Sequence, residues 1–288
     1  MSNTDLIIEE RSRDIGDFLV GRILPFRKKR MVGPFIFIDH MGPTTVGPNN
    51  YMDVNQHPHI GLSTLTYLLE GEILHQDSIG SHQVITPGAV NLMVAGKGVT
   101  HTERTPNELR DGRSVSVHGY QIWIALPKEK EEMEPEFHHI ERSQLPTWSD
   151  GPANFVLIAG KGYGKTSPVP AHSPQFMIEV KTTDDYILDI GQNLSGEIGI
   201  CIINGSINAC DQEISKANML VSKTEGVCKI TVKKDSHLLL FGGEPMIERH
   251  IHWNFVSSSK EKIEEAKNNW KEKKFPSVPN DDTYVPLP

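Results

Sequence analysis

The chain consists largely of short apolar runs rich in β-branched and aromatic residues, and their spacing limits the folds it can adopt. Gly, Pro, Asn and Asp residues bound each run. Short runs with turn signals between them predict strands, and many such strands in one chain predict a β-sandwich or β-barrel. The clearest runs are PFIFIDH (34–40), LSTLTYLLEG (62–71), AVNLMVAG (89–96), YQIWIAL (120–126), NFVLIAG (154–160), QFMIEV (175–180), GICIING (199–205) and SHLLLFGG (236–243).

One segment near the end of the sequence predicts a helix instead. Ser258 and Glu261 have the spacing of a capping box, and Ile263, Ala266 and Trp270 then recur on one helical face. Lys and Glu occupy the opposite face, and a proline follows the segment. We expect an amphipathic helix of about four turns that docks on a barrel.

The two halves of the chain resemble each other. LLEGEI (68–73) is similar to IINGSI (202–207), and VAGKG (94–98) is similar to FGGEP (241–245). The repeat predicts two related β-barrels in tandem, joined by the charged, proline-marked segment 128–150. We therefore divide the chain into an N-terminal barrel, residues 1–140, and a C-terminal barrel with the helix and tail, residues 141–288.

Composition and charge exclude several function classes. The net charge is −8 over 288 residues, which disfavours direct binding of nucleic acid. The basic run Arg27 to Arg30 reads as a solvated turn or strand end. The sequence shows no apolar stretch long enough to cross a membrane and no secretory signal, so we expect a cytoplasmic protein, or also a nuclear one in a eukaryote. Cys201, Cys210 and Cys228 read as reduced thiols.

Two pairs of side chains stand out as candidate metal ligands. His57 and His59 are two residues apart at the start of a strand, and His101 and Glu103 repeat this spacing after a Gly-rich turn. Residues i and i+2 of a strand point to the same face. Two such pairs on facing strands would direct three imidazoles and one carboxylate to a single point inside the barrel.

This donor set suits a divalent first-row transition metal. Two or three His with one carboxylate and open positions favour Fe(II), while Mn, Ni, Co, Cu and Zn remain alternatives. The lack of thiolate ligands argues against a closed structural zinc site.

We interpret the other histidines as structural or supporting residues. His250 and His252 have the same spacing as the first pair but no obvious partner pair, so we interpret them as structural. By the internal repeat, the second barrel lacks a complete ligand set. His75 is expected to support the site or the fold rather than to bind the metal, and His118 to be a buried residue on a barrel strand.

Two blocks of this sequence, HPHIGLSTLTYLLEGEILHQDSIGS (57–81) and PGAVNLMVAGKGVTHTE (87–103), resemble the pirin family of the cupin superfamily. The similarity continues through VHGYQIWIALP and WNFVSSSKEKIEEAKNNWKEKKFP, and so covers nearly the whole chain. It implies an all-β bicupin: two tandem jelly-roll barrels with a C-terminal amphipathic helix and the metal in the N-terminal barrel. The family's ligands fall on His57, His59, His101 and Glu103. Many members have Glu where this chain has Ser63.

The resemblance implies two classes of function. The first is a dioxygenase that acts on quercetin-like flavonols or related enol or catechol compounds, with Glu103 as general base and dioxygen as co-substrate. The ring would open with loss of carbon monoxide. The alternative is a redox-sensitive, iron-binding regulatory partner of a transcription factor or metabolic enzyme. A third interpretation gives the metal a purely structural role.

The segment AGKGYGKTS (159–167) nearly matches a phosphate-binding loop. Its first position is Ala159 rather than Gly, and SPVP follows where a helix would have to begin. We therefore interpret it as a flexible loop.

Overall fold

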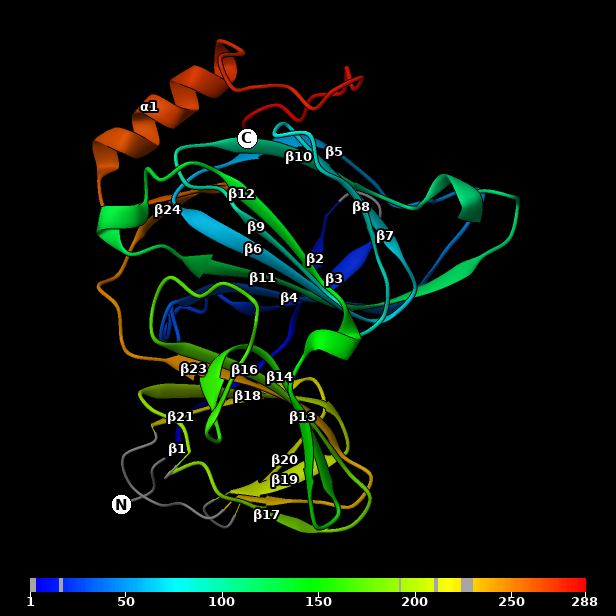
Figure 1. The fold of residues 1–288 in the computed structure, drawn as a ribbon, viewed down its shortest axis with the longest axis vertical. Helices are drawn as coiled ribbons and strands as arrows, with labels where there is room; N and C mark the ends of the chain where they lie inside the picture. The colour runs from blue at the N-terminus through cyan, green and yellow to red at the C-terminus, as the bar shows by residue number, and fades with distance from the viewer. Residues whose placement is uncertain (1–3, 16–17, 192, 210–211, 224–229) are drawn as a thin grey trace. The chain divides into compact units, whose positions relative to one another are not determined.

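The computed structural model describes residues 4–15, 18–191, 193–209, 212–223 and 230–288. These residues form strands and one α-helix, so the predicted all-β class with a C-terminal helix is confirmed (Figure 1). Contacts divide the chain into two compact units. We call them the first barrel and the second barrel, and each is described separately.

The first barrel comprises residues 12–21, 37–142 and 247–288. Its strands are β2 (Arg11–Asp14), β3 (Leu19–Leu24), β4 (Phe35–Val46), β5 (Asp53–His59), β6 (Leu62–Glu70), β7 (Ile73–Asp77), β8 (His82–Ile85), β9 (Val90–Val94), β10 (Val99–Arg104), β11 (Val115–Ala125), β12 (Glu136–Ile140), β24 (His250–His252) and β25 (Phe255–Ser257). The contact-based units assign the ends of β2, β3 and β4 to the second barrel.

Two main sheets form the first barrel. The larger has the order β12-β9-β6-β11-β4-β3-β2, and the smaller has the order β5-β10-β7-β8. One cluster of its core joins apolar side chains from both sheets, among them Met41, Leu68, Ile73, Ile85 and Val117. A β24–β25 hairpin completes this unit.

The second barrel comprises residues 1–11, 22–36 and 143–246. Its strands are β1 (Thr4–Glu9), β13 (Thr147–Asp150), β14 (Ala153–Gly162), β15 (Lys165–Thr166), β16 (Gln175–Thr182), β17 (Tyr186–Leu188), β18 (Glu197–Asn204), β19 (Ser206–Ala209), β20 (Gln212–Ser215), β21 (Asn218–Lys223), β22 (Ile230–Val232) and β23 (His237–Gly243). The larger sheet runs β1-β21-β18-β23-β16-β14-β13, with β15 beside β14, and the smaller runs β17-β22-β19-β20.

The two units are discontinuous in sequence. Strand β1 pairs with β21 in the second barrel, whereas the final segment 247–288 belongs to the first. The contacts therefore group the chain differently from the linear division at residues 140 and 141. That division stays a prediction about independently folding domains.

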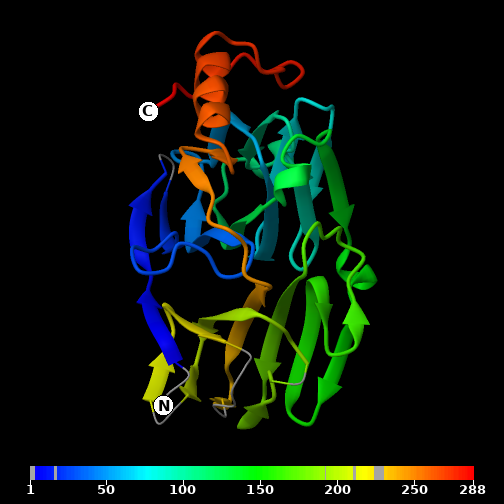
Figure 2. The same cartoon turned by 90° about the vertical axis from the view of Figure 1, so that its left-hand side faces the viewer.

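The helix α1 spans Lys260–Lys271 and packs on β24 and β25 (Figure 2). The buried residues Ile263, Ala266 and Trp270 are those that the sequence pattern predicts. The cap is Ser259, whose Oγ accepts a hydrogen bond from the Lys262 amide, so the helix begins one residue later than the predicted capping box.

The internal repeat is confirmed in one place and wrong in another. β6 and β7 correspond by their places in the sheets to β18 and β19, as the first similarity predicts. The second similarity is out of register, because FGGEP begins within the end of β23, which occupies the place of β11 and not of β9. The segment 128–150 is more than a connector, since it contains β12 and β13.

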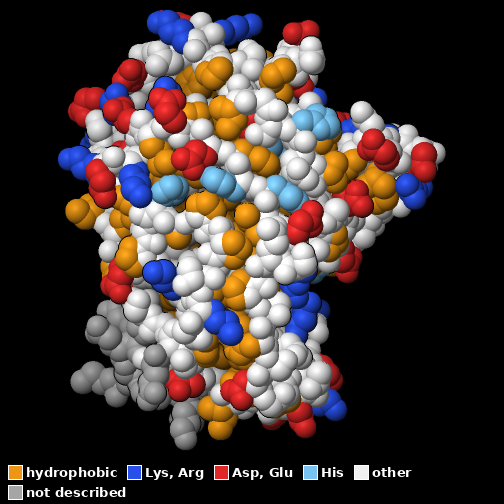
Figure 3. Space-filling model, in the orientation of Figure 1, with side chains coloured by type: hydrophobic (Ala, Val, Ile, Leu, Met, Phe, Trp, Pro, Cys, Tyr) orange, Lys and Arg blue, Asp and Glu red, His pale blue; other side chains and the backbone are white. Residues whose placement is uncertain are grey.

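The remaining sequence interpretations concern turns and thiols. Residues 159–167 comprise the end of β14, a two-residue turn and β15, without a following helix. The basic run lies in a turn closed by a bridge between Phe26 and Lys29. Cys201 is buried, and Cys210 and Cys228 lie outside the described residues. On the face in Figure 3, acidic and basic side chains are interspersed. None of the helices in the described part of the chain combines the length and apolar character needed to cross a membrane.

Candidate metal centre

The smaller sheet of the first barrel positions the predicted ligands. His57 and His59 lie on β5, and His101 and Glu103 lie on the adjacent β10. His57 is directly opposite His101 in the antiparallel register. The two i, i+2 pairs therefore lie on adjacent strands and meet at His57 and His101, whereas Glu103 is opposite Val54.

Glycine turns bring both ligand strands to this position. Gly61 follows β5 with φ of +68°, and a Cβ atom there would lie 2.0 Å from the Val256 carbonyl oxygen. Gly98 precedes β10 with φ of +147°. Both conformations favour glycine, so each strand can turn immediately beside its histidines.

Three imidazoles converge on one point. Ligand nitrogens of His57, His59 and His101 lie within 4.8 Å of one another. The Nε2 atoms of His59 and His101 are 3.1 Å apart. Two nitrogens bound at about 2.1 Å and at right angles to one ion would be separated by about 3.0 Å, so this spacing fits a first-row metal.

The ring of His57 is oriented by its own strand. Its Nδ1 donates to the carbonyl oxygen of Asn55 at 2.8 Å. A proton on Nδ1 leaves the lone pair on Nε2 available to a metal, which is the usual arrangement for ligand histidines. The residues present therefore fit a divalent ion in both spacing and tautomer.

Burial keeps these imidazoles neutral. It lowers the pKa of His57 to about 4, with the backbone of Asn55 acting in the opposite direction. The pKa values of His59 and His101 lie well below the ordinary value, first because of burial and then because of the neighbouring histidines. Neutral imidazole is the form that binds metals.

Glu103 is close to only part of this cluster. Its carboxylate forms a second group with His101 and His75, and the four predicted ligands do not fall within one 4.8 Å group. The pairing of β10 with β5 shifts register between His101 and Glu103, which separates the carboxylate from the β5 histidines. Burial raises the pKa of Glu103, while charge on His75 and hydrogen bonds from Thr66 and Gln121 act in the opposite direction.

Several residues around the cluster were not singled out from the sequence. Thr66 lies 3.5 Å from the Glu103 carboxylate and donates to Gln121 at 2.8 Å. Trp123 packs edge-on against His59 at 5.2 Å between ring centroids. The signal that could have found them is strand alternation, since these residues share one face of paired β6 and β11.

Ser63 lies on the other face of β6. It is paired with Ile124, whereas Thr66 is paired with Gln121 and contacts the cluster. Because alternate residues point to opposite faces, the Ser63 side chain points away from the imidazoles. Its replacement of an acidic residue therefore removes no group from the cluster.

His75 and Asp77 extend the cluster onto β7. His75 Nε2 donates to Asp77 Oδ2 at 3.0 Å, and His75 Nδ1 lies 3.4 Å from His101 Nδ1. The ring of His75 also stacks on Phe137. Burial alone would raise the pKa of Asp77, but hydrogen bonds from His75 and Ser81 hold it below its ordinary value.

The C-terminal tail is tied to the outer edge of the ligand strands. Gln56, next to His57, donates to the carbonyl oxygens of Asp281 and Thr283. Arg104, next to Glu103, forms an ion pair with Asp281 at 2.5 Å. The tail therefore connects β5 to β10 beside their ligands.

The other histidines lie elsewhere. His250 and His252 are on β24 and belong to neither ligand group. His118 lies on β11 as predicted but is half-buried rather than buried, and its Nε2 is 2.8 Å from that of His40.

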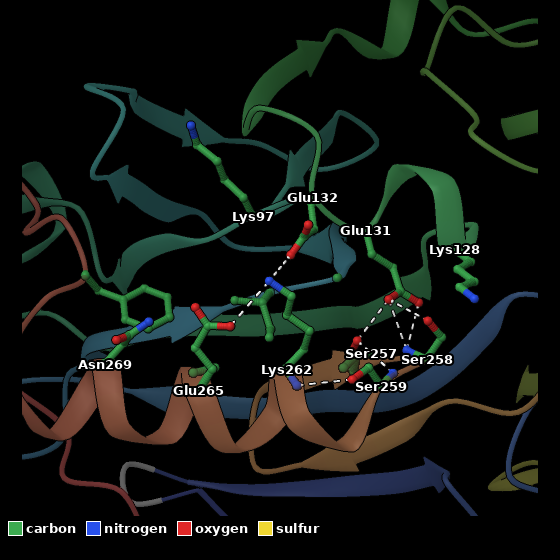
Figure 4. Close-up of a pocket in the computed structure, with 16 residues that line it drawn as sticks. Lys97, Lys128, Glu131, Glu132, Ser257, Ser258, Ser259, Lys262, Glu265 and Asn269 are labelled. Atoms are coloured by element: carbon green, nitrogen blue, oxygen red, sulfur yellow. Dashed lines mark hydrogen bonds and ion pairs between the residues drawn. The ribbon is translucent and has the colours of Figure 1, made fainter.

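A cavity of about 550 Å³ lies between α1 and the loop that follows β11 (Figure 4). Its polar groups are largely paired with one another: Glu131 accepts hydrogen bonds from Ser257 and Ser258, and Lys262 forms ion pairs with Glu132 and Glu265. None of the candidate ligands lines it.

Comparison with known proteins agrees with this fold. The chain is 43% identical over 289 residues to a pirin-like protein of Caulobacter vibrioides, covering 99% of both chains. A crystal structure of quercetin 2,3-dioxygenase from Acinetobacter baumannii superposes with a TM-score of 0.88 at 35% identity, covering 98% of this chain and 94% of the other. The bacterial pirin YhhW from Escherichia coli, solved in complex with nickel(II), shares the fold with a TM-score of 0.65 at 19% identity, covering 84% of this chain and 99% of the other.

The family assignment follows from both halves of the chain. Residues 18–124 match the family described as Pirin. Residues 177–276 match the Pirin C-terminal cupin domain. Together with two cupin barrels and a His/Glu group able to bind a metal, these matches show that the chain belongs to the pirin family.

Proposed function

We propose that this protein is a metal-dependent dioxygenase of flavonols such as quercetin, or of related enol and catechol compounds. The observation that carries the proposal is the convergence of three neutral imidazoles, with the Nε2 atoms of His59 and His101 3.1 Å apart. Similarity to the quercetin 2,3-dioxygenase of Acinetobacter baumannii supports the substrate class.

We assign His57, His59, His101 and Glu103 as ligands of Fe(II), with Mn, Ni, Co, Cu and Zn as alternatives, and Glu103 would approach the β5 histidines when the ion binds. A divalent ion held there would supply Lewis acidity toward a substrate hydroxyl. The protein's own part is to hold the imidazoles: Asn55 orients His57, and Trp123 packs against His59.

Glu103 has a second role in this proposal, as the base that accepts the substrate's hydroxyl proton. Burial raises the pKa of Glu103, and a raised pKa makes the carboxylate a stronger base. Thr66 and Gln121 hold the carboxylate in place. Overall, flavonol and dioxygen would yield a ring-opened ester and carbon monoxide.

The test is aerobic consumption of quercetin by iron-loaded protein, followed by absorbance and release of carbon monoxide. Glu103→Gln should lower turnover by about 10²-fold or more, since general bases contribute that much. Glu136→Gln is the matched control, because Glu136 pairs with His138 outside the ligand groups. If metal is confirmed in the site and neither quercetin nor a panel of enediols is consumed, the oxygenase proposal is wrong.

A second candidate is a redox-sensitive regulatory protein. The observation that favours it is the seclusion of the cluster: His57, the most exposed of the three imidazoles, is 9% exposed, and the cavity beside α1 does not include it. In this candidate, the change from Fe(II) to Fe(III) alters a surface that binds a protein partner. Identical hydrogen exchange in the Fe(II), Fe(III) and metal-free forms would contradict it.

A further inference from the structure

A row of buried side chains leads from His101 on β10 to His75 and Asp77 on the adjacent strand β7. His101 Nδ1 lies 3.4 Å from His75 Nδ1, and His75 Nε2 lies 3.0 Å from Asp77 Oδ2. The other oxygen of Asp77 accepts from the backbone amides of Ile79 at 3.1 Å and Ser81 at 2.9 Å. His101, His75 and Asp77 are 0%, 4% and 0% exposed, so bulk water does not compete for these bonds.

With a neutral His75, the order of donors along this row of side chains has one solution. Asp77 can only accept, so His75 Nε2 carries the proton that binds it. The Nδ1 of His75 then has the lone pair and accepts from His101 Nδ1. His101 is left with its lone pair on Nε2, the atom that faces His59.

We propose that Asp77 and His75 are positioning residues that fix the tautomer of His101 and so make its Nε2 a metal ligand. This inference rests on the proposed metal centre, and it assigns roles to residues that are not ligands themselves. Partners behind ligand histidines raise metal affinity because they fix ring orientation and tautomer.

The substitution Asp77→Asn keeps the shape of the side chain but reverses the direction of the hydrogen bonds that link residue 77 to His75 and His75 to His101. The amides of Ile79 and Ser81 require an acceptor, so the oxygen of the introduced carboxamide stays with them and its NH₂ group faces His75. His75 must then accept at Nε2 and donate from Nδ1. His101 becomes the acceptor at Nδ1, and its proton moves to Nε2, where it blocks metal binding. We expect affinity for Ni(II) to fall by about 10- to 100-fold.

Removal of His75 separates this role from that of a ligand. His75→Ala removes the hydrogen bonds between Asp77 and His101, so His101 can take either tautomer. Ni(II) affinity should therefore fall less than in Asp77→Asn, by under about tenfold. In the double variant, Asp77→Asn should have no further effect. If His75 were itself a ligand, His75→Ala would be the more damaging change.

Glu179→Gln provides the matched control. Glu179 is 3% exposed and its carboxylate accepts from His237 at 2.8 Å, in the second barrel. This pair belongs to neither of the two ligand groups. The control should leave Ni(II) affinity unchanged.

The experiment measures Ni(II) affinity by calorimetry and His tautomers by long-range ¹H–¹⁵N NMR of Zn(II)-loaded and metal-free protein, with circular dichroism to verify folding. The inference predicts a proton on Nδ1 of His101 in the native chain and on Nε2 in Asp77→Asn. Equal Ni(II) affinity of the native protein and Asp77→Asn, or an unchanged His101 tautomer in that variant, would overturn the inference. If the native chain binds neither ion, the metal proposal fails, and the tautomers of the metal-free protein still decide the inference.

Discussion

The small sheets of the two barrels have the same order of strands, but one set of strands carries polar side chains and the other carries aliphatic side chains. β5, β10 and β7 of the first barrel occupy the places of β17, β22 and β19 of the second. The first set carries His57, His59, His101 and His75, and the second carries Leu188, Ile230, Val232 and Ile207. The same backbone frame therefore supports either a polar cluster or an aliphatic core, and fold alone does not fix chemistry.

This difference has an energetic side. The aliphatic interior gains stability from burial of apolar area, about 25 cal/mol per Å². Buried imidazoles gain less, and each polar group left without a partner costs about 1–3 kcal/mol. We therefore expect the first barrel to depend on a bound ion for stability and the second to be indifferent to it.

The largest expected effect is that of His101→Ala. His101 is fully buried and belongs to both ligand groups, so its loss should lower metal affinity by more than about 100-fold, the upper range for losing a supporting partner alone. Metal analysis of purified protein would show near-stoichiometric metal falling to background. His237→Ala in the second barrel is the control. Retention of metal in His101→Ala would contradict the assignment of the metal site to the first barrel.

Chelation should unfold the two barrels unequally. An ion present at 1,000 times its Kd stabilises the folded state by about 4 kcal/mol. Hydrogen exchange after chelator treatment should therefore speed up in β5, β7 and β10 and stay unchanged in β17, β19 and β22. Equal acceleration in both sets would mean that the metal is not confined to the first barrel.

Ile207→Ala should have the opposite pattern of effects, a loss of stability without a loss of metal. Ile207 is fully buried in the core of the second barrel, and truncation of such a residue costs about 2–5 kcal/mol. Denaturant unfolding should show this loss, while metal content stays at the native level. A loss of metal would show coupling between the barrels that the account does not contain.

Asp281→Asn weakens the tie between the tail and the ligand strands. The ion pair with Arg104 and the hydrogen bonds of Thr283 to Asp281 contribute roughly 1.5–3 kcal/mol at neutral pH. Hydrogen bonds from Thr283 and Arg104 outweigh burial and lower the pKa of Asp281 below its ordinary 3.8. The stabilisation is therefore present above pH 3.8 and is lost as pH falls through the lower folded value.

Thermal unfolding measured across pH would check this sign. The difference between native and Asp281→Asn chains should shrink on acidification below pH 3.8, and a difference that grows there would contradict it.

The smallest effect is expected for Ser63→Ala. Because Ser63 faces away from the cluster, Ni(II) affinity should stay at the native level in this variant. Thr66→Ala, on the cluster face, should have the larger effect on affinity.

Local spacing predicts much of this site, and nonlocal pairing decides the rest. Strand alternation is enough to place His57 with His59 and His101 with Glu103 on shared faces. The separation of Glu103 from the β5 histidines depends on a register shift between two strands that are distant in sequence. No local pattern encodes that shift, and the same holds for the contact of His75 with His101.

The strand class and the helix were also predictable from the sequence, because their periodicities are local. The pairing of β1 with β21 was not, since a polar N-terminal segment gives no sign of its partner. The predicted match of FGGEP to VAGKG was wrong for a similar reason, because a Gly-rich turn can occur at the end of different strands in related barrels.

The most direct test of the central claim is anomalous diffraction from crystals loaded with Fe(II) or Ni(II). We predict one peak in the first barrel, about 2.0–2.2 Å from nitrogens of His57, His59 and His101 and from a carboxylate oxygen of Glu103. A peak elsewhere, or none at these side chains under saturating metal, would contradict it.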